Sequence, residues 1–93
     1  MRRLLMFSTL TLTQFAQAAV LAVAVEGAVR LELHDTTGPC LGEARHAVYT
    51  DGRQRVPGCW VARDGEVQVA FLDGDALQVP VRAFRRPEEA MLR

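Results

Sequence analysis

The sequence predicts a mostly β protein, a small five-stranded antiparallel meander or open barrel with an N-terminal helical signal or anchor segment. Three observations lead to this fold class. A charge-free apolar stretch follows the first three residues, apolar and polar residues alternate in the second half, and Asp-Gly pairs separate the alternating runs. Asp-Gly between apolar runs is a strong hairpin signal, because both turn residues accept positive φ. The pairs are Asp51-Gly52, Asp64-Gly65 and Asp73-Gly74.

Length and composition bound the class of protein. The chain has 93 residues, which supports one domain, and its hydrophobic content of 49% is that of a folded protein. Its 11 basic and 11 acidic residues balance, so no basic excess is present. This balance argues against nucleic acid as a partner and against a disordered chain.

The amino terminus has the layout of an export signal. Met1-Arg2-Arg3 is a positive start, and no charged residue occurs from Leu4 to Val25. Small residues in Ala16-Gln17-Ala18 predict a signal peptide over residues 1–18, cleaved before Ala19. A second small-residue site, Ala22-Val23-Ala24, would extend it to residues 1–24, with cleavage before Val25. The alternative is a retained anchor helix over residues 4–25, which is long enough to span a bilayer.

The body of the chain is expected to form the β domain, residues 26–86, followed by a polar tail, residues 87–93. Residues 66–72 alternate so that Val67, Val69 and Phe71 share one face. Pro80 cannot donate a ladder hydrogen bond, so its strand is expected to be an edge strand or to end there. Pro87 favours a turn of helix in the tail. The other expected strands cover residues 28–34 (Val29, Leu31 and Leu33 inward), 44–50, 56–63 and 76–81 (Leu77, Val79 and Val81 inward).

Two cysteines, Cys40 and Cys59, are expected to form one disulfide, the default for an even count in an exported domain. Closing the loop would stabilise the fold by about 3 kcal/mol on the chain-entropy model. The alternative is a thiol enzyme in which one of these cysteines is the nucleophile and His46 is the base. Zinc-ligand spacing is absent from the sequence, so no metal is expected.

No recognised catalytic or cofactor-binding motif occurs in the sequence, so we assign no catalytic residue and no cofactor. Three residues are candidates for binding. Trp60 is expected in the core against the disulfide, with an exposed binding anchor as the alternative. Asp73 and Asp75 are interpreted as solvated acids of a hairpin turn, because their loop lacks the further ligands of a calcium site.

A pattern of short motifs suggests a family likeness. It comprises Cys40, Gly58-Cys59-Trp60, the run Val67-x-Val69-x-Phe71-x-Asp73-Gly74-Asp75, and Pro80. In residues 28–84 the chain resembles a group of small uncharacterised exported proteins of proteobacteria and their prophages. The resemblance implies periplasmic location in, or secretion from, a Gram-negative bacterium and a bridged sheet, and it transfers no catalytic residue.

The functional hypothesis is therefore a non-enzymatic interaction module of the cell envelope, whose partner is another envelope component, protein or glycan. It predicts an exposed apolar or aromatic patch on one sheet face. One alternative is an accessory subunit anchored in the inner membrane, with its domain outside the cytoplasm. The other is the Cys-His thiol enzyme.

Overall fold

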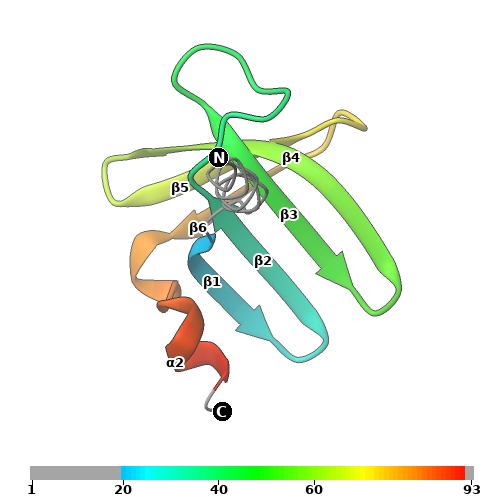
Figure 1. The fold of residues 1–93 in the computed structure, drawn as a ribbon, viewed down its shortest axis with the longest axis vertical. Coiled ribbons are helices and arrows are strands. Elements are labelled where there is room, and N and C mark those ends of the chain that lie inside the picture. The colour runs from blue at the N-terminus through cyan, green and yellow to red at the C-terminus, as the bar shows by residue number, and fades with distance from the viewer. Residues whose placement is uncertain (1–19, 92–93) are drawn as a thin grey trace, which may run out of the picture.

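The computed structural model describes residues 20–91, which form an antiparallel sheet of six strands in simple meander order (Figure 1). The mostly β fold class is confirmed, with six strands where the sequence predicts five. No helix among the described residues is long and apolar enough to cross a membrane. The elements are β1 (Val20–Glu26), β2 (Val29–His34), β3 (Arg45–Asp51), β4 (Gln54–Arg63), β5 (Glu66–Phe71), β6 (Ala76–Pro80), the 3-10 turn η2 (Val81–Ala83) and the helix α2 (Pro87–Met91).

The additional strand, β1, comes from the apolar stretch at the amino terminus. The sheet begins at Val20, before the expected domain boundary at residue 26, and the predicted signal peptide 1–18 lies outside the described residues. Residues 20–25, which the anchor interpretation places in a helix, pair with β2 instead. Gly27, at a φ of 61°, makes the turn between the two strands. Valines in this run favour a strand once a partner is available, because their branched side chains pack well on a pleated surface.

The Asp-Gly pairs lie at the predicted hairpin turns. Each glycine has positive φ, and Asp64 joins Gly65 in the left-handed region at a φ of 53°. The turns connect β3 to β4, β4 to β5 and β5 to β6. The antiparallel meander therefore follows from local turn chemistry.

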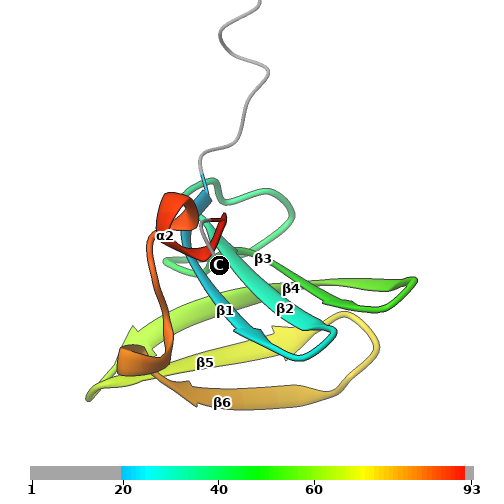
Figure 2. The same cartoon turned by 90° about the horizontal axis from the view of Figure 1, so that it is seen from below.

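The sheet curls into an open half-barrel, and the chain after β6 returns to its first strand (Figure 2). Val23 and Arg85 exchange backbone hydrogen bonds, each 2.8 Å long. This pairing covers the outer edge of β1. At the other end of the sheet, β6 is the last strand in the order, as the position of Pro80 predicts.

The core lies on the concave face of the half-barrel. Cross-strand partners share a face, and the core cluster follows that rule from β2 to β5, whereas Val48 of β3 is buried on the opposite face. The inward residues predicted for β2 and β5 are confirmed in the core or packed against it, except for Val29, which is half-buried. In the last strand, Leu77 and Val81 are exposed instead, because β6 has no neighbour on one side and Val81 already belongs to η2. The buried cluster contains Leu31, Leu33, Ala47, Val67 and Val69.

Candidate functional site

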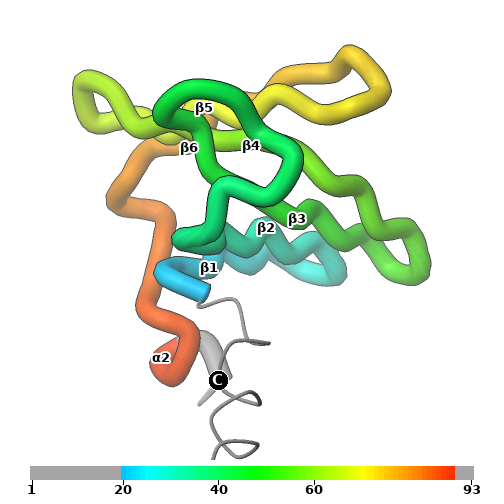
Figure 3. Tube along the Cα trace, turned by 45° about the horizontal axis from the view of Figure 1, so that its top comes forward, coloured from blue at the N-terminus to red at the C-terminus, as the bar shows by residue number. Residues whose placement is uncertain are grey.

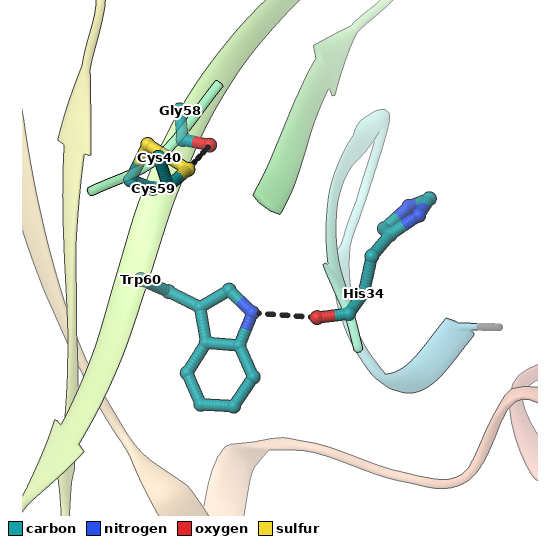
Figure 4. The surroundings of a disulfide bond; sticks show 5 residues. All are labelled: His34, Cys40, Gly58, Cys59 and Trp60. Carbon is teal, nitrogen blue, oxygen red and sulfur yellow. Dashed lines mark hydrogen bonds between the residues drawn. A yellow bond between two sulfur atoms is a disulfide. The ribbon is translucent and has the colours of Figure 1, made fainter. Parts of the chain in front are cut away.

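A disulfide ties the long loop 35–44 to the sheet. The sulfur atoms of Cys40 and Cys59 are bonded, with Cα atoms 5.7 Å apart, which confirms the predicted bridge (Figure 4). Figure 3 shows this loop arching out between β2 and β3. Neither cysteine is free, so neither supplies a thiolate, and the Cys-His enzyme interpretation is wrong for the oxidised protein. Disulfides persist in oxidising compartments, which favours a location outside the cytoplasm.

Contrary to the prediction, Trp60 does not pack against the disulfide. Cys59 and Trp60 are consecutive in β4, so their side chains point to opposite faces of the sheet (Figure 4). Trp60 packs against the concave core, half-buried. Its indole N–H donates to the backbone oxygen of His34 at 3.0 Å, which fixes the ring between β4 and β2. Trp60 therefore packs against the structural core, as the sequence predicts.

Asp73 and Asp75 lie in the turn between β5 and β6, and both are exposed. The backbone N–H of Asp75 donates to Asp73 Oδ1 at 3.0 Å, the local turn that aspartate commonly makes. Neither Asp73 nor Asp75 forms a salt bridge within residues 20–91. Within the same residues, no three His, Cys, Asp or Glu side chains group as metal ligands.

These two acids border a groove at the open end of the half-barrel. The groove has a volume of about 440 Å³ and includes Tyr49, Val56, Phe71 and Leu77 among its lining residues. Tyr49 and Phe71 form an edge-to-face aromatic pair with ring centroids 5.7 Å apart. The groove therefore combines an aromatic floor with a rim that carries two carboxylates, those of Asp73 and Asp75.

A second groove, of about 600 Å³, runs along the outer face beside the disulfide. It is larger, but its lining consists of small or aliphatic side chains and two glutamines, without an aromatic or a charged group. Binding sites usually combine apolar walls with a few converging polar groups. The smaller concave groove meets this description better, and we take it as the candidate site.

Sequence reasoning found part of this site. It singled out Asp73 and Asp75, and the alternation in β5 placed Phe71 on the inward face. It missed Tyr49, because the register that brings β3 beside β4 and β5 is not visible in local patterns. The signal that could have found it is the aromatic residue itself, at an inward position of the 44–50 strand.

The outer face carries a cluster of titratable groups on β2 and β3. The rings of His34 and His46 lie edge to face, with their centroids 5.2 Å apart. His34 Nε2 lies 3.1 Å from Glu32 Oε1, and Arg30 Nε donates to Glu32 at 2.8 Å. Burial alone would raise the pKa of Glu32, but the hydrogen bonds from Arg30 and His34 lower it overall. Burial, and then the charges of His34 and Arg55, lower the pKa of His46.

We expect acid to destabilise the fold through His46 first. Its pKa is lower in the folded protein than the ordinary 6.5, so below that pH the unfolded chain binds the proton more readily. Stability is therefore lost as the pH falls through 6.5, and the lowered pKa of Glu32 adds a further loss at more acidic pH. Urea unfolding measured from about pH 7 to about pH 5 should show the midpoint falling, and His46→Gln should flatten the fall. An equal slope in His46→Gln would contradict this assignment.

Fold and site together define a small disulfide-stapled β domain with a concave aromatic groove and an acidic rim. In comparisons with known proteins, no family model, curated protein or solved structure matches the chain.

Proposed function

We propose that this protein is an exported interaction module of the cell envelope, and that its concave groove binds a basic, apolar segment of another envelope protein. The observation that carries the proposal is the groove, in which the Tyr49–Phe71 pair lies beside Asp73 and Asp75. An aliphatic side chain would cover the aromatic floor. An arginine or lysine next to it would meet the carboxylates, and the aromatic faces also attract a cation.

The architecture supports a binding role over a catalytic one. The groove is lined by strands of one sheet that tight turns connect, and a preformed site loses little entropy when a ligand binds. The residues around the groove offer carboxylates and aromatic rings but no histidine or cysteine. Recognition of a cation requires only such groups.

Export is part of this proposal, and the fold favours one of the two cleavage sites. Cleavage before Ala19 leaves β1 whole. Cleavage before Val25 would remove Val23, which is 1% exposed and pairs with Arg85. The mature protein would then lose most of an edge strand and reopen the edge that Arg85 covers. The intact mass of protein recovered from the periplasmic fraction distinguishes the two products.

The groove is tested with two labelled peptides, one alternating leucine with arginine and one alternating leucine with glutamate. We expect the basic peptide to bind and the acidic one not to bind, as measured by fluorescence anisotropy. Asp73→Asn retains the oxygen that accepts the turn hydrogen bond from Asp75 but removes the charge. It should weaken binding of the basic peptide about threefold, the worth of one exposed ion pair.

Asp64→Asn is the matched control, because Asp64 occupies the Asp-Gly turn between β4 and β5, is exposed and does not line the groove. It should bind like the wild type. Equal binding of both peptides, or equal loss in the two variants, would contradict a cation-selective groove. Binding of a soluble peptidoglycan fragment in place of the basic peptide would identify a glycan as the ligand.

A further inference from the structure

The two edges of the sheet differ in how they are protected. The edge of β1 is paired with Arg85, whereas β6 has only β5 as a neighbour among the described residues (Figure 2). Edge strands that stay single are usually very short, carry charges or proline, or are covered. The five residues of β6, Ala-Leu-Gln-Val-Pro, contain no charge, and the one proline is the last residue of the strand. This strand is therefore open to pairing with another chain.

The backbone groups that β6 presents outward can be assigned from its pairing with β5. Phe71 N–H donates to the Asp75 oxygen, and Val81 N–H donates to the Gly65 oxygen. Hydrogen-bonded pairs alternate along an antiparallel ladder, so Leu77 and Val79 also face β5. The backbone groups of Ala76, Gln78 and Pro80 then point away from the sheet. Pro80 has no N–H, but because its backbone faces away from β5, no hydrogen bond within the sheet is lost.

We propose that β6 pairs antiparallel with β6 of a second copy of this chain, about a two-fold axis at Gln78. In this register the two Gln78 residues exchange backbone hydrogen bonds, and the N–H of each Ala76 donates to the Pro80 carbonyl of the other copy. The missing N–H of Pro80 leaves one carbonyl in each copy, that of Ala76, without a partner in the ladder. The sheet becomes continuous across the dimer.

Side chains at the edge support a second copy as the occupant. The register sets Leu77, which is 36% exposed, opposite Val79 of the second copy on the concave face. The nearest charged residues lie at opposite ends of β6, with Asp75 before it and Arg82 after it, and both are exposed. Antiparallel pairing brings Asp75 of each copy towards Arg82 of the other. The strand is therefore complementary to itself in hydrogen bonding, apolar contact and charge.

The test compares Gln78→Lys with Gln68→Lys. Gln78 and Gln68 are cross-strand partners and both are exposed, but Gln68 lies on β5, inside the sheet. At the two-fold axis, Gln78→Lys would set two ammonium groups opposite each other, and we expect the dimer dissociation constant to rise about tenfold. Gln68→Lys adds the same charge away from the axis and should dimerise like the wild type. Sedimentation equilibrium over micromolar to millimolar concentrations measures both.

Hydrogen exchange of the wild type gives an independent answer. The amides of Ala76 and Gln78 should be protected at high concentration and should exchange freely on dilution, whereas that of Val79 stays protected in the monomer. A wild type that is monomeric throughout, or equal dimerisation of the two lysine variants, would overturn the proposal. So would free exchange of the Ala76 and Gln78 amides in a dimer.

Discussion

Replacing Cys40 and Cys59 by alanine is expected to lower the free energy of unfolding by about 3 kcal/mol, because the unfolded chain gains the freedom of an open loop. This is a large part of the stability of a domain of this size. The concave core contains neither cysteine, so the sheet should still form. Urea unfolding should show a lower midpoint, with the circular dichroism of the folded state almost unchanged.

Leu41→Ala is the control for this experiment. Leu41 lies next to Cys40 in the same loop and is 86% exposed, so its truncation should change stability by less than about 0.5 kcal/mol. The reduced wild type should resemble the double alanine variant. If the double variant unfolds at the wild-type midpoint, the bridge contributes nothing and the fold depends on its core alone.

Gly58→Ala is expected to be the second severe change, with a loss of about 1–3 kcal/mol from overpacking. A Cβ at Gly58 would lie 2.8 Å from the carbonyl oxygen of Ala70 and 2.8 Å from Cδ1 of Phe71. Gly58 is paired with Phe71 between β4 and β5, so the backbone there cannot move away without breaking the ladder. The urea midpoint of the variant measures this loss.

A double-mutant cycle separates the two contacts. Phe71→Leu removes the ring that a new Cβ would meet but leaves the Ala70 carbonyl in place. We therefore expect Gly58→Ala to remain destabilising in the Phe71→Leu background, by less than in the wild type. A midpoint for Gly58→Ala equal to that of the wild type would show that β4 and β5 can separate locally, contrary to the close approach at Gly58.

Local patterns predicted most of the sheet. Asp-Gly turns and alternation located five strands, the inward faces of β2 and β5, and the edge position of Pro80. They missed β1 because its residues, Val20–Glu26, continue the apolar composition of the preceding stretch. Its two faces also meet different neighbours: Ala22 and Ala24 pack on the core, and Val23 is buried on the opposite face beside Arg85. A strand that is apolar on both faces shows no alternation.

The candidate site, too, was predicted from the sequence only in part. The two aspartates are visible as a turn motif, and the disulfide follows from the cysteine count. Their relation to Tyr49 depends on register across three strands, which sums many weak cross-strand contacts. The position of Trp60 away from the disulfide, in contrast, follows from alternation in β4, and the sequence interpretation overlooked it.

The sequence by itself determined the fold class, the turns with their exposed aspartates, and the bridge, because each depends on residues that are close in the chain or on cysteine chemistry. The tertiary structure decided what joins distant segments: the return of Arg85 to β1, the aromatic pair beneath the rim, and the uncovered edge of β6. These features arise when the curled sheet closes on one side and stays open on the other. That geometry is set by the packing of the whole core and by no local run of residues.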